Sequence, residues 1–279
     1  MLSYRHSFHA GNFADVLKHA TLALIIEALR RKDAGFCYID THAGAGRYDL
    51  FSGQASKTGE WREGIARLWD VKKAPPELDS YLAAVRALNG KALRYYPGSP
   101  RVVRPQLRPQ DRMLLLELHT SELPLLQQEF AGDAPVRVEH VDSYQGLKAY
   151  LPPRERRGLV FIDPAYELQP ESDRVLRMLR EAYRRWDSGC YAIWYPILNR
   201  TAVDRWHRRL SSTTIRKILI VELGVRPDNT PGGMNGCGLV LVNPPYQLDT
   251  QLTTLVPWLA QTLGADQRAA CRVDWLVPE

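Results

Sequence analysis

The chain has 279 residues, of which 45% are hydrophobic and 24% charged, with a net charge of +6. This size predicts a single domain over residues 1–279 with an ample core, and no apolar run approaches the ~18 residues of a membrane span. The four cysteines lie far apart without a C-x-x-C pair, which argues against a zinc site and against a disulfide framework. The basic charge favours an anionic partner, most commonly nucleic acid.

The N-terminus lacks the apolar core of a signal peptide, so we expect a cytoplasmic protein. A helix is predicted from Ala14 to about Arg31, because apolar residues recur there at helical spacing. Asn12 is the candidate N-cap, and Asp15 suits the first turn. Four histidines fall within the first 42 residues, but their spacing matches no metal-ligand pattern. We therefore expect no bound metal.

A short strand over 36–40 runs into a loop over 41–46 that contains Gly44 and Gly46. Rossmann-type folds use such a loop to bring the backbone close to a nucleotide ligand. The loop is not G-x-G-x-x-G, and an acidic residue ends the strand. This variant suits S-adenosylmethionine, which has no pyrophosphate to bind.

Residues 47–94 interrupt the alternation of strands and helices. They contain two helical patterns, around 61–69 and 77–88, which predict a small helical insertion subdomain. The segment 94–100, rich in Pro and Gly, is read as a loop returning to the main sheet.

Regular alternation then resumes. Strands are predicted at 113–117, 136–141, 159–162, 191–195, 215–223 and 239–242. Helices are predicted at 121–130, with Ser121 as its cap, near 172–186 and near 202–210. The loop between the last two strands is too short for a helix, so these strands pair antiparallel. The result is an α/β fold of the Rossmann-like methyltransferase type, with a seven-stranded mixed sheet.

Asp163-Pro164-Ala165-Tyr166 follows the buried fourth strand and is the candidate active-site turn. Amino-methyltransferases use this pattern, in which an acceptor and a backbone carbonyl hold the two N–H groups of the target amine. Asp163 and the Pro164 carbonyl would supply these acceptors, and Tyr166 would stack on the base. Glu117 ends the second strand, where an acidic residue bonds the ribose hydroxyls of a nucleotide.

A second copy of this pattern, Asn243-Pro244-Pro245-Tyr246, follows the seventh strand. By its letters it is the better match to the motif. The seventh strand runs antiparallel to its neighbours, so its carboxyl end points to the opposite edge of the sheet. We therefore read the second copy as structural.

The opening MLSYRHSFHAGNFADVLKH, the block YIDTHAGAGRYDL, the segment RYYPGSP and the ending DWLVPE resemble the bacterial ribosomal RNA large subunit methyltransferase J family. The similarity runs from end to end. It implies N6-methylation of one adenine in 23S ribosomal RNA, with S-adenosylmethionine as methyl donor and protein-free RNA as the preferred substrate. We expect the protein to be a monomer.

The resemblance also implies site residues. The implied cofactor contacts are His19, His42, Ser99, Glu117, Asp142, Ser143 and Asp163, and Asp163 is also the catalytic residue. The implied substrate contacts are Tyr4, His6, Lys18, Pro164 and Tyr166. The chain departs from the family at Ser143, where glycine is usual, and at Ala165, where a second proline is usual.

Two other functions fit the same features. One is adenine methylation of DNA, although no separate target-recognition domain is visible. The other is a non-catalytic RNA-binding assembly factor in which Ala165 marks a decayed site. Retention of Asp163, Tyr166, Glu117 and the glycine loop argues against decay.

Overall fold

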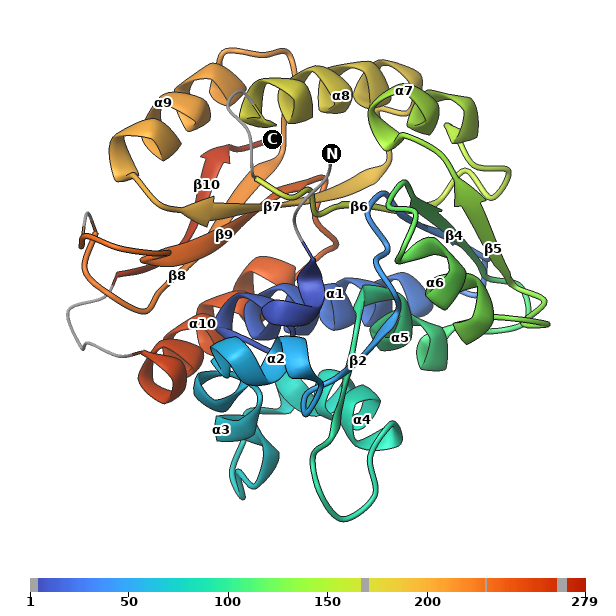
Figure 1. The fold of residues 1–279 in the computed structure, drawn as a ribbon. Coiled ribbons are helices and arrows are strands. Elements are labelled where there is room, and N and C mark those ends of the chain that lie inside the picture. The colour runs from blue at the N-terminus through green and yellow to red at the C-terminus, as the bar shows by residue number, and fades with distance from the viewer. Residues whose placement is uncertain (1–4, 167–170, 229, 265–269) are drawn as a thin grey trace.

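The computed structural model describes residues 5–166, 171–228, 230–264 and 270–279. Its strands are β1 (Cys37–Asp40), β2 (Arg47–Asp49), β3 (Tyr95–Pro97), β4 (Arg112–Glu117), β5 (Val136–His140), β6 (Gly158–Ile162), β7 (Cys190–Ile197), β8 (Ile218–Gly224), β9 (Gly236–Val242) and β10 (Cys271–Val277). All but β2 and β3 form one eight-stranded sheet in the order β10-β8-β9-β7-β6-β1-β4-β5 (Figure 1). The fold is Rossmann-like, as predicted.

The strand directions agree with the prediction for the seven strands that the sequence indicated. β5, β4, β1, β6 and β7 are parallel to one another, whereas β9 is antiparallel to both β7 and β8. The count of seven was wrong, because β10 adds an eighth strand antiparallel to β8. β10 is an edge strand with no fully buried residue, so its hydrophobic pattern is weak.

Helices cover both faces of the sheet (Figure 1). One face carries α7 (Ser143–Gly146), α8 (Glu171–Arg185) and α9 (Arg200–Ser211). The other carries α1 (Phe13–Arg30), α5 (Ser99–Val103), α6 (Leu123–Glu129) and α10 (Leu248–Leu263). Successive strand residues point to opposite faces, so Tyr38 belongs to the core under α1 and Ile39 to the core under α8.

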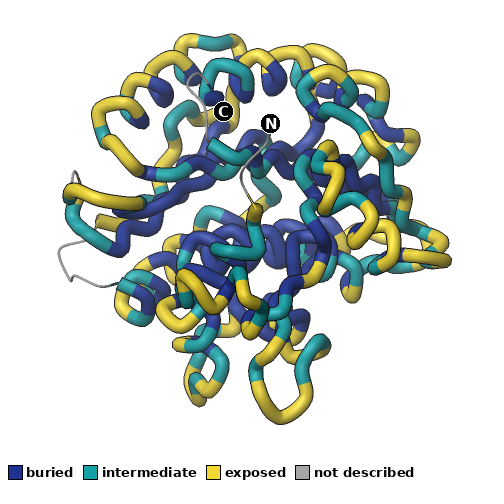
Figure 2. Tube along the Cα trace, in the orientation of Figure 1, coloured by how far each residue is buried: buried dark blue, intermediate teal, exposed yellow. Residues whose placement is uncertain are grey.

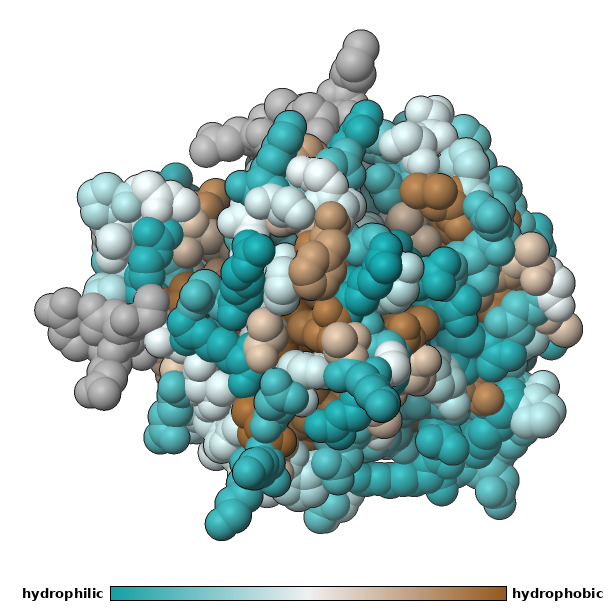
Figure 3. Space-filling view, turned by 60° about the horizontal axis from the view of Figure 1, so that its bottom comes forward, coloured by the Kyte–Doolittle hydropathy of each residue, from teal (hydrophilic) through white to brown (hydrophobic). Residues whose placement is uncertain are grey.

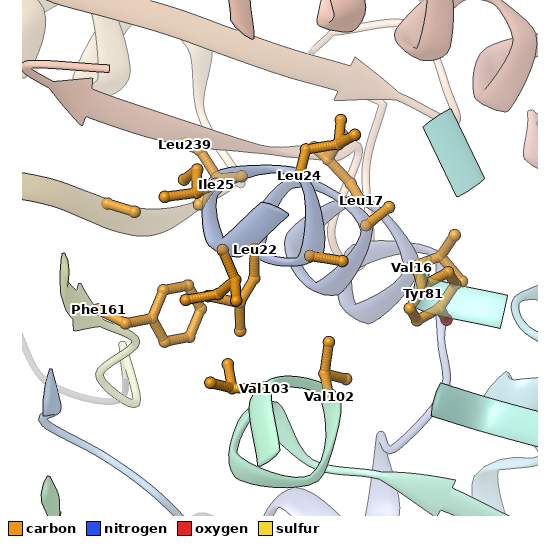
Figure 4. Close-up of a cluster of buried hydrophobic side chains, with 14 of the residues drawn as sticks. Val16, Leu17, Leu22, Leu24, Ile25, Tyr81, Val102, Val103, Phe161 and Leu239 are labelled. Carbon is orange, nitrogen blue, oxygen red and sulfur yellow. The ribbon is translucent and has the colours of Figure 1, made fainter. Parts of the chain in front are cut away.

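The helix α1 is buried on almost every side, as the dark tube at the centre of Figure 2 shows. Its apolar side chains meet Phe161 of β6, Leu239 of β9 and Val102 of α5 (Figure 4). Apolar residues extend around most of its circumference, as expected for a helix in the interior of a domain. The predicted cap is confirmed, because the Asn12 side chain accepts a hydrogen bond from the Asp15 backbone N–H at 3.0 Å.

The predicted Ser121 cap is wrong. α6 starts at Leu123 after Glu122, and no side chain caps it. The Ser121 backbone N–H instead donates to Nδ1 of His119 at 3.2 Å. The backbone N–H of Ser121 is thus already paired within the local turn before the helix begins.

The segment between β1 and α5 contains α2 (Gly53–Thr58), α3 (Ala66–Trp69) and α4 (Asp79–Ala87), which lie below α1 in Figure 1. Helical structure occurs in both predicted places, although the first is split into a 3-10 turn and α3. The strands β2 and β3, which were not predicted, pair at the two ends of this segment. Seen from below, the surface is mainly hydrophilic, with hydrophobic atoms gathered near its centre (Figure 3).

The second copy of the tetrapeptide lies at the edge of the sheet away from Asp163. Val242, the last residue of β9, pairs with Tyr191 at the start of β7. The Asn243 side-chain amide donates to the carbonyls of Asp187 and Gly189 at 2.7 and 2.8 Å. Tyr246 is 82% exposed. Asn243 therefore ties two loops together, in agreement with the structural interpretation.

All four cysteines are free, and Cys271 on β10 is the exposed one. No helix in the described ranges is long and apolar enough to cross a membrane.

The contact between β6 and β1 gives a test of the fold. Gly158 pairs with Cys37, and a Cβ on Gly158 would collide with the Cys37 carbonyl oxygen. We expect Gly158→Ala to lower the free energy of unfolding by about 2 kcal/mol or more, measured by urea denaturation. Gly90→Ala is the matched control, because nothing lies within 4 Å of its added Cβ. Equal stabilities of the two variants would contradict the packing described.

Candidate active site

A cavity of about 750 Å³ opens at the carboxyl edge of the sheet. β1 and β6 are neighbours, so the loop after Asp40 and the turn after Ile162 both border it. Every predicted site residue within the described ranges lines this cavity: His6, Lys18, His19, His42, Ser99, Glu117, Asp142, Ser143, Asp163, Pro164 and Tyr166. Tyr4 lies outside the described residues.

Glu117 holds the glycine loop in place. Its Oε2 accepts from the Gly44 backbone N–H at 2.7 Å, and its Oε1 accepts from the His119 backbone N–H at 2.6 Å. Gly44 has φ +61, and an added Cβ would collide with the Tyr48 hydroxyl. Each carboxylate oxygen keeps a second lone pair that can accept from a hydroxyl group. The Glu117 carboxylate is thus held in a fixed position beside the tight loop at Gly44, with lone pairs left to accept hydrogen bonds.

Asp40 is a buried carboxyl that the prediction of site residues left out. It accepts from the Tyr38 hydroxyl and from the Ser99 hydroxyl, both at 2.6 Å. Burial raises the pKa of Asp40 to about 6, although these hydrogen bonds oppose the shift. The predicted residue Ser99 therefore acts here by donating to Asp40. An acidic residue at the end of the first strand was the signal in the sequence.

Two neutral histidines form part of the wall. The Thr41 hydroxyl donates to the Phe161 carbonyl at 2.9 Å, so it accepts from Nδ1 of His42 at 2.8 Å. This leaves Nε2 of His42 as an acceptor, with the Ser143 hydroxyl 3.4 Å away. Nδ1 of His19 lies 2.8 Å from the Tyr96 hydroxyl. Burial lowers the pKa of both imidazoles to about 3.

Asp142 holds the neighbouring helix. Its side chain accepts from the Tyr144 backbone N–H at 2.9 Å and so caps α7. Ser143 is the first residue of that helix and is buried. The Ser143 hydroxyl lies 3.4 Å from Nε2 of His42, within hydrogen-bond distance.

Lys18 lies between two carboxylates. Its Nζ is 2.5 Å from Oδ2 of Asp163 and 2.8 Å from Oδ1 of Asp15. Asp15 also accepts from the Gly11 backbone N–H at 2.8 Å and lies 2.9 Å from Nε2 of His6. Burial raises the pKa of Asp15, but the charges of His6 and Lys18 outweigh it and hold the pKa well below its usual range. Helix α1 thereby delivers a buried ammonium group to the candidate catalytic residue.

Tyr166 is fixed against β7. Its hydroxyl donates to the Trp194 carbonyl at 2.9 Å, and the two rings meet edge to face with centroids 5.8 Å apart. Pro164 and Ala165 complete the turn and line the cavity. Asp163 also lines the cavity, and among the described residues no hydrogen bond to its Oδ1 is present.

Several lining residues were not predicted. They are Trp194, Pro196 and Leu198 at the end of β7, and Leu118 after β4. Tyr144 and Arg174 add a cation–π contact, with the guanidinium 4.0 Å from the ring centroid. The position of Pro196 and Leu198 at the carboxyl end of β7 was a usable signal, because ligands bind at the carboxyl ends of parallel strands. Among the described residues, no group of three His, Cys, Asp or Glu side chains is placed to hold a metal ion.

Comparison with known proteins gives consistent matches. A family model described as "Ribosomal RNA large subunit methyltransferase D, RlmJ" matches residues 33–277. Two proteins named Ribosomal RNA large subunit methyltransferase J, from Haemophilus influenzae and Escherichia coli, are each 50% identical over 100% of both chains. A crystal structure of a Legionella pneumophila protein is similar with a TM-score of 0.89 and 35% identity, over 96% of this chain and 98% of that one.

The buried imidazole of His42 gives a test by pH. Its pKa in the folded protein, about 3, lies below the value of ~6.5 in an unfolded chain. The unfolded chain therefore takes up a proton first, and stability falls as the pH drops below ~6.5. The free energy of unfolding should fall between about pH 6 and pH 4.5, and we expect this fall to be about 2 kcal/mol smaller in His42→Asn than in the wild type. Urea denaturation at each pH measures it.

His9→Asn is the control for this experiment. The hydrogen bond that His9 donates to Glu60 raises the pKa of His9, against the effect of burial. Its contribution to stability is therefore fully present below ~6.5 and disappears as the pH rises. The free energy of unfolding that His9→Asn loses between about pH 6 and pH 4.5 should therefore match the loss in the wild type. A wild-type slope in His42→Asn would mean that His42 is protonated in the folded protein.

Proposed function

Because the chain belongs to the ribosomal RNA large subunit methyltransferase J family, we propose that it transfers a methyl group from S-adenosylmethionine to N6 of one adenine in 23S ribosomal RNA. The observation that carries this proposal is the shared cavity. The Asp163–Tyr166 turn and the loop fixed by Glu117 open into one space of about 750 Å³. An amine acceptor and a nucleoside site are therefore neighbours.

The residues present fit S-adenosylmethionine. Glu117 keeps free lone pairs for the ribose hydroxyls, and Gly44 lets the backbone come close. The partly exposed Leu118 offers an apolar surface to an adenine ring. His19, His42, Ser99, Asp142 and Ser143 complete this side of the cavity. When bound, the cofactor supplies an electrophilic methyl group.

The turn is suited to an exocyclic amine. Oδ1 of Asp163 and the Pro164 carbonyl would accept the two N6 hydrogens, and Tyr166 offers a ring for stacking, which contributes roughly 1–3 kcal/mol. These two acceptors direct the nitrogen lone pair away from the base ring. Transfer then precedes proton loss, because a carboxylate is a weak base for a neutral aromatic amine. Alignment of the reacting groups supplies much of the rate.

Lys18 keeps this carboxylate oriented. Its buried ammonium group holds Oδ2 of Asp163 at 2.5 Å, so Oδ1 is the oxygen left for the substrate. His6 joins the same group through Asp15 at 2.9 Å. We therefore assign Lys18 and His6 to the substrate side of the cavity, as the family resemblance implies. Ala165 leaves the Pro164 carbonyl in the turn, so we expect activity without the second proline.

Asp163 lines a cavity, so a target adenine must leave its base stack and enter this cavity to reach the carboxylate. This requirement favours an RNA whose target region is not covered by ribosomal proteins. We accordingly propose deproteinised 23S ribosomal RNA, rather than the assembled subunit, as the substrate.

The role of Asp163 is tested by removing its carboxylate. We expect Asp163→Ala to lower kcat at least about 100-fold, while S-adenosylmethionine still binds in titration calorimetry. Asp70→Ala is a matched control on an exposed aspartate outside the cavity. Wild-type turnover in Asp163→Ala would remove Asp163 from the mechanism.

The function itself is tested with radiolabelled S-adenosylmethionine. Deproteinised 23S ribosomal RNA, assembled large subunits and duplex DNA are offered in parallel, and the labelled nucleoside is identified. We expect N6-methyladenosine from the free RNA and little or no label in the other two. Label in DNA would favour the DNA methyltransferase, and binding of RNA without any transfer would favour an assembly factor.

A further inference from the structure

Leu198 is an exposed apolar side chain on the rim of the candidate site. It is 55% exposed, yet it lines the cavity that holds Asp163. Exposed leucines are common, and one alone means little. Its position is what distinguishes it: it directly follows β7, the strand beside β6.

The backbone around Leu198 is held from both sides. Ile197 is buried, and its carbonyl accepts from the Asn235 backbone N–H at 3.0 Å. Asn199 caps α9 by accepting from the Ala202 backbone N–H at 3.0 Å. Arg200 forms ion pairs with Glu222 and Asp228, both at 2.9 Å. The backbone on both sides of Leu198 is therefore held by hydrogen bonds and ion pairs, and the leucine side chain between them is largely exposed.

The second exposed leucine of the rim, Leu118, has a different position. It follows β4, so β1 and β6 lie between it and β7. Leu118 is next to Glu117 and belongs to the nucleoside side of the cavity. Leu198 follows β7, four residues beyond the Trp194 whose ring contacts Tyr166, and it lines the same cavity as Asp163. Leu198 therefore lies on the rim of the cavity that a base must enter to reach Asp163.

We propose that Leu198 is a wedge that enters the RNA stack in the place vacated by the target adenine. This inference rests on the proposed function, because it requires a base that leaves its stack. Flipping loses the stacking of the extruded base, and an apolar side chain in the gap restores part of the contact with the neighbouring bases. A rigidly mounted leucine provides this contact without the entropy cost of ordering a loop.

The test compares two RNAs that contain the adenine methylated by the wild type. One is a hairpin that keeps this adenine stacked, and the other is an unstructured oligonucleotide with the same flanking bases. We expect Leu198→Ala to lower kcat/KM roughly tenfold on the hairpin and less than about twofold on the oligonucleotide. Leu198→Met, which keeps an apolar side chain of similar length, should retain most of the activity on both.

Leu125→Ala is the matched control, because Leu125 is 51% exposed on α6 and does not line the cavity. With 2-aminopurine replacing the target adenine, Leu198→Ala should also reduce the rise in fluorescence on binding to the hairpin. Equal losses on both RNAs, or no loss on either, would overturn the wedge. Absence of transfer by the wild type to any RNA would instead refute the proposed function.

Discussion

The parallel pairing of β6 with β1 is the contact on which the site depends. Neighbouring strands lie ~4.8 Å apart, so the loop after Asp40 and the turn at Asp163 are forced to the same edge. Gly158 permits this approach because it has no side chain to meet the Cys37 carbonyl. A change in this register would separate the glycine loop from the turn at Asp163 while leaving each of them locally intact.

Helix α1 contributes both to the hydrophobic core and to the polar site. Its apolar side chains fill the space under the sheet, while Asp15, Lys18 and His19 are buried in the same helix. Burying charges is unfavourable unless they are paired, and Lys18 is paired with both Asp15 and Asp163. The hydrophobic core and the polar site are therefore built on one element. Changes in the packing of α1 will reach Asp163 directly.

The order of strands and helices was readable because each strand of the parallel core is a short, strongly apolar run. The strand directions then distinguished the tetrapeptide at Asp163, the active-site candidate, from the second copy at Asn243. The residue types alone match the motif better in the second copy. β10 was missed because an edge strand buries only part of each side chain. The strands β2 and β3 were missed because each is a three-residue element whose partner lies almost fifty residues away.

Within the site, the sequence indicated which residues gather but not what they contact. Asp163, Glu117 and the glycine loop were recognisable from their places at strand ends. The link from Lys18 to Asp163 joins residues that are far apart in the chain, and no local pattern predicts it. The Ser99 contact with Asp40 is of the same kind. Such distant pairs depend on the packed fold.

The distribution of thiols makes the protein convenient to label. Cys37, Cys190 and Cys237 are buried, and burial raises the pKa of each thiol to about 12, which suppresses its reaction with alkylating reagents. Cys271 is exposed on the edge strand, and β8, β9 and β7 separate that strand from β6. A maleimide fluorophore would therefore attach at one position without any substitution, and it would report on RNA binding from a place that leaves the cavity unobstructed.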